Sequence, residues 1–175
     1  RCEAKRGEAR GQTTQEAGLK MDYEIRLGRE HTRIDDVWAL LRESYWSPGV
    51  RREVTEEAVR NSLCVGAFLR ATDRQVGFAR AVTDYATFAW LSDVVVHPEH
   101  RRHGLSKRMI ETLFDHPQLR TLRRWCLATR DAHDLYARYG FKPVDPGFFM
   151  ERKNDPSVWQ ATPTAPPRHP PESTR

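Results

Sequence analysis

Long apolar runs are missing from this sequence. Nothing in it approaches the roughly 20 apolar residues that a membrane-spanning helix needs, and its beginning has no apolar core of a signal peptide. We therefore expect a cytoplasmic protein with no membrane partner. Cysteine is also scarce: Cys2, Cys64 and Cys126 form neither a C-x-x-C pair nor a metal-ligand spacing. Because Cys64 and Cys126 stand in apolar runs, we expect reduced, buried thiols there.

The two ends of the chain lack the residues that build a core. Residues 1–20 contain no aromatic and no β-branched aliphatic residue, and six of the 11 prolines lie in residues 154–175. Such segments do not bury enough apolar surface to offset the roughly 1–2 kcal/mol per residue that backbone ordering costs. We expect a disordered N-terminal extension at 1–20, one domain at 21–153 that starts naturally near Met21, and a Pro-rich disordered tail at 154–175.

The net charge of +5 is not spread as a nucleic-acid-binding surface would require. Residues 1–20 carry +2 and residues 153–175 carry +1, which leaves +2 for the domain. The domain does contain one short basic cluster, formed by Arg101, Arg102, His103, Lys107 and Arg108. A small anionic ligand suits this cluster better than a long polyanion does, and we expect no nucleic-acid partner.

Apolar periodicity predicts an α+β domain with a mixed sheet. We expect strands at 22–27, 64–71, 75–83, 87–96, 124–128 and 148–152. We expect helices at 35–43, 55–62, 105–114 and 132–139. Thr55 and Asp131 are the expected N-caps of the second and fourth helices, and Gly140 is the residue expected to end the fourth.

A strand, a basic loop and a helix follow one another between Leu91 and Met109. The strand ends at Val96, and Gly104 opens the helix. The first-turn N–H groups of a helix have no intrahelical partner and lie at the positive end of its dipole, so they bind anions. Glycine also lets the backbone approach a phosphate closely. A single glycine makes neither a P-loop nor a dinucleotide fingerprint, so this pattern alone is a weak signal.

Two motifs resemble those of the GNAT superfamily of N-acetyltransferases, in particular its single-domain bacterial-type members. Residues 101–106 read R-x-x-G-x-S and resemble the family's R/Q-x-x-G-x-G/A pyrophosphate loop, with its usual V-x-P-x-x-R context beginning at Val96. Residues 129–141 read T-x-x-A-x-x-L-Y-x-x-x-G-F and resemble the family's N-x-x-A-x-x-L-Y-x-x-x-G-F. Two residues depart from these motifs. Ser106 stands where Gly or Ala is usual, which is a mild change because all three are small, and Thr129 stands where Asn is usual. The resemblance covers residues 21–152.

The resemblance implies a GNAT fold, with a mixed, mostly antiparallel central sheet flanked by helices, and acetyl-CoA as cosubstrate. The backbone of Val95 and Val96 would pair with the pantetheine amides. Tyr136 would hydrogen-bond the CoA sulfur and give a proton to the departing thiolate. Thr129 replaces the Asn that supports the pantetheine arm, which puts that contact in doubt. The pyrophosphate would be held by Arg101, Arg102, His103, Gly104, Leu105 and Ser106.

Amide formation needs a neutral amine, and an amine of pKa roughly 10 must first lose a proton. Asp93 is the best candidate for the general base, because an acid within an apolar strand calls for a reason. Two other interpretations of Asp93 stay open, namely that it binds a substrate ammonium or that it faces solvent. Asp84, Asp131 and His133 are weaker candidates.

Three aromatic residues are candidates for the acceptor site: Tyr45 and Trp46 in a loop after the first helix, and Trp90. Together they would form an apolar or cation-binding pocket, although packing of the loop on the core explains them as well. His97, His100 and His103 recur every three residues. Pro98 prevents a helix across them, and we expect no metal.

These observations predict an N-acetyltransferase that moves the acetyl group of acetyl-CoA to a primary amine by direct attack in a ternary complex. The acceptor is a small-molecule or peptide amine that the sequence does not name. A non-catalytic acyl-CoA-binding sensor module is the alternative, and nucleic-acid binding through the basic ends is a third hypothesis. The sequence does not decide whether the protein forms a homodimer.

Overall fold

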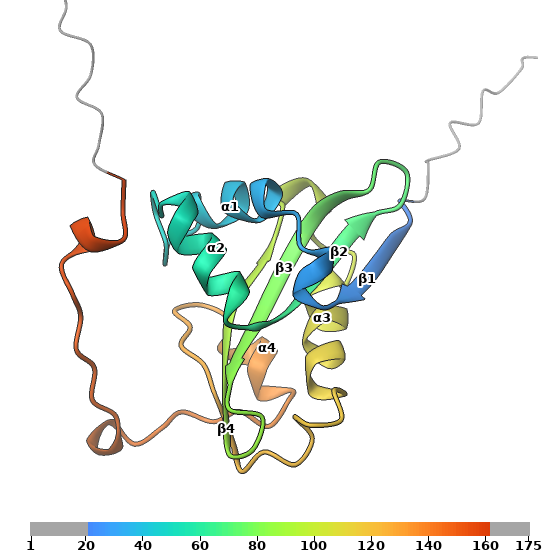
Figure 1. The fold of residues 1–175 in the computed structure, drawn as a ribbon. Coiled ribbons are helices and arrows are strands. Elements are labelled where there is room, and N and C mark those ends of the chain that lie inside the picture. Colours follow the sequence, from blue (N-terminus) through green and yellow to red (C-terminus); the bar gives the residue numbers. More distant parts are fainter. Residues whose placement is uncertain (1–20, 162–175) are drawn as a thin grey trace, which may run out of the picture.

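Five strands form one sheet in the order in which they occur along the chain (Figure 1). The computed structural model describes residues 21–161. The strands are β1 (Tyr23–Leu27), β2 (Leu63–Leu69), β3 (Arg74–Thr83), β4 (Phe88–Val96) and β5 (Arg124–Cys126). Pairs from β1 to β4 are antiparallel, and β5 joins β4 in parallel. The predicted α+β class with a mostly antiparallel mixed sheet is confirmed.

Helices cover both faces of the sheet (Figure 1). The helices are α1 (Ile34–Arg42), α2 (Arg52–Arg60), α3 (Leu105–Phe114) and α4 (His133–Ala137). Short 3-10 turns add η1 (Arg29–His31), η2 (Pro98–His100), η3 (Pro146–Phe148) and η4 (Pro156–Val158). Because strand side chains alternate between faces, the core divides into two clusters. Phe78 packs with α1 and α2, whereas its neighbour Ala79 packs with α3.

The predicted third helix has the bounds of α3, and its apolar face is buried at Leu105, Met109, Ile110 and Leu113. The predicted start of the second helix is wrong. α2 begins three residues earlier than expected, and Thr55, the expected N-cap, is buried inside it. Tertiary packing decides this start, because Thr55 and Val59 stand four residues apart and are the buried positions of α2.

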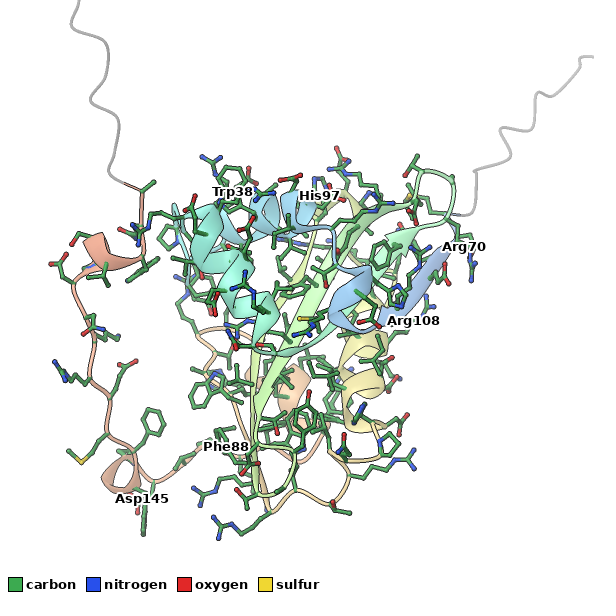
Figure 2. All side chains as sticks on the ribbon, in the orientation of Figure 1. Trp38, Arg70, Phe88, His97, Arg108 and Asp145 are labelled. Atoms are coloured by element: carbon green, nitrogen blue, oxygen red, sulfur yellow. The ribbon has the colours of Figure 1, made fainter. Side chains whose placement is uncertain are left out.

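No strand forms at residues 148–152, so the predicted last strand is wrong. After α4 the chain leaves the sheet, turns at η3 and exposes Phe148 and Met150 at 86% and 96% (Figure 1). Asp145 marks this outlying turn in Figure 2. Within the described residues, β5 therefore receives no further strand beside it.

The chain then returns to the α1–α2 side. Gln160 forms an antiparallel bridge with Val50, the N–H of Arg51 donates to the carbonyl of Trp159 (3.0 Å), and the N–H of Ala161 donates to the carbonyl of Gly49 (2.9 Å). Residues 154–161, which the sequence analysis assigned to the tail, thus include contacts with the domain. The expected disorder of residues 1–20 and 162–175 concerns segments outside the described residues.

No helix within residues 21–161 is both long and apolar enough to span a bilayer. A cytoplasmic location stays a prediction from the sequence.

Candidate active site

The site lies where β4 and β5 separate. β5 pairs with β4 only from Phe88 to Trp90, whereas β4 continues to Val96. In Figure 2, β4 runs from Phe88 at one end of the molecule towards His97 at the other. A cavity of about 420 Å³ occupies the split. Its walls are residues 91–94 of β4, residues 128–132 after β5, and the side chains of Tyr45, Trp46 and Tyr136.

A β-bulge interrupts β4 at this cavity. Phe78 pairs with Val95 and Arg80 pairs with Ser92, so Asp93 and Val94 together stand opposite a single residue of β3. Asp93 takes the left-handed backbone conformation, with φ of 56°. A bulge leaves its extra residue outside the ladder and redirects the side chains around it. Backbone amide groups of β4 are thereby made available at the wall of the cavity.

The Asp93 carboxylate is held by two donors. Arg80 Nε donates to Oδ2 (2.5 Å), and the indole N–H of Trp46 donates to Oδ1 (3.1 Å). Arg80 in turn donates to Ser62 Oγ (3.0 Å). The Asp93 and Arg80 side chains are 9% and 17% exposed. The interpretation that Asp93 merely faces solvent is therefore wrong, while each carboxylate oxygen keeps a lone pair for a further donor.

Tyr136 reaches the same cavity from α4 and is almost fully buried. Burial, followed by the nearby Tyr45 and Asp131, raises the pKa of Tyr136 to about 12. Its phenol therefore stays protonated at neutral pH, the form that is able to donate a proton. This chemistry matches the role of acid that the resemblance implies.

Two of the three predicted acceptor-site aromatics meet at this cavity. The rings of Tyr45 and Trp46 pack edge to face with centroids 4.9 Å apart. The Arg130 guanidinium lies 3.9 Å from the centroid of Tyr45, and the Tyr45 hydroxyl accepts from the Arg130 N–H (3.1 Å). Trp90 lies elsewhere and stacks on Phe149 at 6.0 Å.

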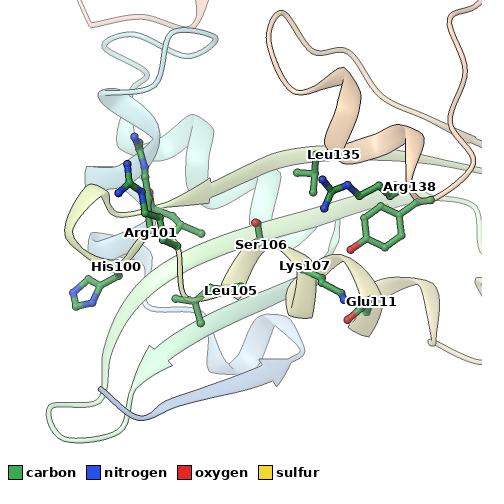
Figure 3. A pocket seen from close by; sticks show the side chains of 12 residues that line it. His100, Arg101, Leu105, Ser106, Lys107, Glu111, Leu135 and Arg138 are labelled. Carbon is green, nitrogen blue, oxygen red and sulfur yellow. Dashed lines mark hydrogen bonds and ion pairs between the residues drawn. The ribbon is translucent and has the colours of Figure 1, made fainter. Parts of the chain in front are cut away.

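A second cavity, of about 490 Å³, opens at the start of α3 (Figure 3). Gly104 and Arg102 take φ values of 69° and 66° there, which turns the loop into the helix. In Figure 3, Arg101 lies on one side, Arg138 on the other, and Ser106 between them. The walls are formed by Val96, His100, Arg101, Arg102, Gly104, Leu105, Ser106, Lys107, Glu111, Leu135, Arg138 and Tyr139. Four cationic side chains and a helix N-terminus without a side-chain cap give this cavity the charge that an anion site needs.

Comparisons with known proteins fit this geometry. Residues 61–143 match the sequence profile of the acetyltransferase (GNAT) domain. A crystal structure from Xanthomonas campestris, assigned to the GNAT family, is 41% identical, covers 76% of this chain and 94% of its own, and superposes with a TM-score of 0.72. The chain belongs to the GNAT family of acetyltransferases. It is accordingly an acyltransferase, as the sequence predicts.

Two further proteins are similar to this GNAT protein at lower sequence identity. A Gibberella zeae protein described as an acetyltransferase is 26% identical over 136 residues, which cover 67% of this chain and 77% of that protein. A CoA complex of an aminoglycoside N-acetyltransferase shares the fold, with 15% identity, a TM-score of 0.58, and coverage of 78% of this chain and 99% of its own. The GNAT family uses acetyl-CoA, and the basic cavity at α3 suits its phosphates.

The predicted CoA-binding residues of this GNAT domain are not all at the cavity walls. Val96 lines the α3 cavity, whereas the Val95 side chain packs with the α1–α2 cluster and leaves only its backbone for a ligand. The His103 ring packs against Tyr23 with centroids 5.3 Å apart. Thr129 lines the split cavity, and its Oγ1 accepts from the N–H of Ala132 (3.1 Å).

The expected N-cap of α4, Asp131, is wrong, because Ala132 holds the N-cap position and no side chain caps the helix there. Asp131 is exposed at the rim of the split cavity, and His133 is exposed and lies outside its walls. Asp84 accepts four hydrogen bonds from Ala86, Thr87 and Phe88, which lower its pKa and fix the turn between β3 and β4. As a turn residue at the far end of β4, Asp84 is not available as a base.

The three histidines near the loop lie close together, with His97 against His100, and with His100 and His103 both against Tyr23. His100 is buried, and its Nδ1 shares a hydrogen bond with the Tyr23 hydroxyl (2.9 Å). Burial, with the nearby His97 and Arg74, lowers the pKa of His100. Candidate ligand atoms of His97, Glu99 and His100 lie within 4.8 Å of one another. The Tyr23 bond occupies one His100 nitrogen, and the absence of a metal stays a prediction.

Sequence reasoning missed several residues at the two cavities. Arg80 is the most important of them, because it pairs with Asp93. The sequence does offer a signal for it: Arg80 is a single cationic residue within an apolar strand, just as Asp93 is a single acidic residue within the next strand. Leu135 lies on α4 and Arg138 directly follows it, and helix spacing alone did not reveal that this segment faces the α3 cavity.

Proposed function

We propose that this GNAT protein transfers the acetyl group of acetyl-CoA to a primary amine by direct attack in a ternary complex. One observation carries the proposal. The split cavity brings together a buried carboxylate at Asp93, the bulged backbone of β4, and the protonated phenol of Tyr136. The acceptor is a small-molecule or peptide amine.

Cosubstrate binding uses the α3 cavity. The N–H groups of residues 104–107 and the side chains of Arg101, Arg102 and Lys107 would hold the pyrophosphate, since they join a helix N-terminus to fixed cations. The backbone of Val95 and Val96 would pair with the pantetheine amides along the edge of β4 that β5 leaves open beyond Trp90. This path follows β4 from the α3 cavity to the split cavity, because Val96 lines the first and Val94 the second.

Proton movement then follows from the charges at the site. Asp93 holds the substrate ammonium and receives one of its protons, which leaves through water. The freed amine nitrogen attacks the thioester carbonyl carbon while the N–H of Val94 stabilises the developing oxyanion. As the C–S bond breaks, Tyr136 donates its proton to sulfur, and the second amine proton restores the phenol. The products are an N-acetyl amide and CoA thiol.

Calorimetric titration of the full chain with acetyl-CoA, followed by thiol release with pooled amines, tests this proposal. Binding together with release supports it, and initial-rate plots against both substrates should intersect, as a ternary complex requires. Parallel plots would instead indicate an acetylated enzyme and overturn direct attack. Binding without release from any pool would favour the acyl-CoA-binding sensor.

A further inference from the structure

A third cavity lies on the other side of the Asp93–Trp46 contact. It has a volume of about 200 Å³ and lies between the α1–α2 layer and the sheet. Asp93 and Trp46 line both this cavity and the split cavity, so the two meet at the carboxylate. A group bound to Asp93 from the split cavity can therefore extend into this space, which we name the acceptor pocket.

Most residues that line the acceptor pocket have apolar side chains. The side walls combine the hydroxyl residues Ser47 and Thr55 with the apolar residues Leu41, Trp46, Val50, Val54, Ala58 and Trp159. Its charged floor is Arg80 and Asp93, and these two charges cancel in their ion pair. An anionic substituent would find no free cation there, because the Arg80 guanidinium already bonds Asp93 and Ser62. An ammonium, by contrast, finds free lone pairs on Asp93 and two indole side chains in the lining.

The size of the acceptor pocket limits its occupant. An apolar protein cavity of about 150 Å³ binds benzene, so a space of about 200 Å³ holds one ring or an alkyl chain of similar bulk. Trp159 closes one side, and the Gln160 bridge to Val50 fixes the returning segment beside it. A space of this size does not hold a long polycationic or a branched polar amine as a whole.

We infer that the acceptor is a primary amine with one compact apolar substituent of about ring size and no anionic group, and that this substituent lies between Trp46 and Trp159 in the acceptor pocket. The inference rests on the proposed function and narrows it to a substrate class. The ammonium meets Asp93, and the nitrogen faces the split cavity where the thioester carbonyl is attacked.

Thiol release by the full chain with a panel of defined amines tests the class. The probes are benzylamine and 2-phenylethylamine, with ethylamine, spermidine, kanamycin and phenylalanine as comparators. We expect kcat/KM for the two aryl amines to exceed that for ethylamine by about 10–100-fold, because the pocket accepts the ring. Phenylalanine should react more slowly than 2-phenylethylamine by a similar factor, since its carboxylate has no partner.

Two variants test whether the acceptor pocket causes the preference for aryl amines. Ala58→Leu fills part of it and should lower kcat/KM for 2-phenylethylamine about 10-fold or more, while ethylamine changes by less than about twofold. Ala39→Leu adds the same atoms to an exposed position of α1 and should change neither substrate. Thermal unfolding and acetyl-CoA titration of both variants check that folding and cosubstrate binding are kept.

The outcomes separate this inference from the proposed function. If acetyl-CoA binds and no amine of the panel or the pools releases thiol, the proposed function itself fails. If spermidine, kanamycin or phenylalanine reacts faster than the aryl amines, or if Ala58→Leu affects ethylamine as much as 2-phenylethylamine, acetyl transfer stands and the apolar-amine class is overturned.

Discussion

Asp93 and Arg80 form the ion pair with the lowest side-chain exposure among the described residues. Neither residue stands alone: Trp46 and Ser62 complete a chain of hydrogen bonds that joins β3 and β4 to two loops. A charge in such a place is costly unless it is paired. The pair therefore fixes the direction of the Asp93 carboxylate, and a change at either member has both a stability and a kinetic consequence.

Asp93→Asn should lower both stability and amine turnover. It leaves the Arg80 charge without compensation in a mostly buried place, so we expect the free energy of unfolding to fall by about 2–3 kcal/mol. Loss of the ammonium partner should lower kcat/KM for the amine about 100-fold. Urea unfolding and initial rates measure the two effects.

The double variant Asp93→Asn/Arg80→Gln is the control, because two neutral amides replace two charges. It should recover part of the stability and none of the activity. Wild-type kcat/KM in Asp93→Asn would exclude Asp93 from the reaction.

Tyr136→Phe should lower kcat about 100-fold, because a positioned acid contributes that much to the departure of the thiolate. The dissociation constant of acetyl-CoA should stay within about threefold, since only one hydroxyl is lost. Tyr85→Phe, at an exposed turn position, should leave kcat unchanged. An unaltered kcat in Tyr136→Phe would remove the acid from the mechanism and leave the fold untouched.

Tyr136 also predicts an alkaline loss of stability. Its pKa is about 12 in the folded chain and near 10 when exposed, so between these values the folded state keeps a proton that the unfolded state has released. The free energy of unfolding therefore falls as pH rises, by about 1 kcal/mol at pH 11 from this group. Tyr136→Phe lacks this titration. From pH 9 to pH 11, its free energy of unfolding relative to that of wild type should therefore rise by that amount, as measured by urea unfolding. The raised pKa of Cys64 affects both proteins equally and cancels.

At the scale of elements, the sequence predicted those segments whose local pattern agrees with their packing. α3 combines a glycine start with apolar spacing of four, and the prediction matched it. The bulge in β4 was not predicted, because Leu91 to Val96 is apolar apart from Ser92 and Asp93 and does not reveal which residue lies outside the ladder. The predicted last strand, at residues 148–152, was wrong for a similar reason. A short apolar run does not by itself determine which strand it pairs with.

The turn into α3 depends on a backbone conformation that glycine adopts without strain. Gly104→Ala should cost about 1 kcal/mol of stability, because φ of 69° crowds a Cβ. That Cβ would also project at the anion cavity, so we expect acetyl-CoA to bind about 10-fold more weakly in calorimetric titration. Gly49→Ala is a matched control with φ of 67° and equally open surroundings. It should lose similar stability and keep its affinity for acetyl-CoA; equal affinity losses in both variants would contradict a role for the loop.

At the scale of the whole molecule, the segment that ends in Trp159 joins the far end of the chain to the α1–α2 layer. Composition predicted a tail from residue 154 onwards, because six of the 11 prolines lie in it. Composition does not show that one tryptophan within such a tail finds an apolar recess beside Val50 and Val54. Nor does it show the backbone bonds that hold the segment there.

Deleting residues 155–175 should lower the midpoint of thermal unfolding by about 5–8 °C, as expected for the loss of about 2 kcal/mol of indole burial and backbone bonding. Deleting only residues 162–175 should change it by less than about 1 °C. Acetyl-CoA should bind both proteins as tightly as the full chain, because the α3 cavity is walled by other elements. Equal midpoints for the two deletions would show that residues 155–161 add nothing to the domain.

The bulge at Asp93 has a consequence for how this strand can change in evolution. Leu91 and Val95 are both odd-numbered, yet Leu91 packs with α3 and Val95 with the α1–α2 cluster, because the extra residue reverses the alternation between them. Removing one residue there would exchange the two faces for every later position of β4. Selection therefore acts on the length of β4 as strictly as on its composition, and insertions or deletions should be tolerated in its flanking turns but not between Leu91 and Val95.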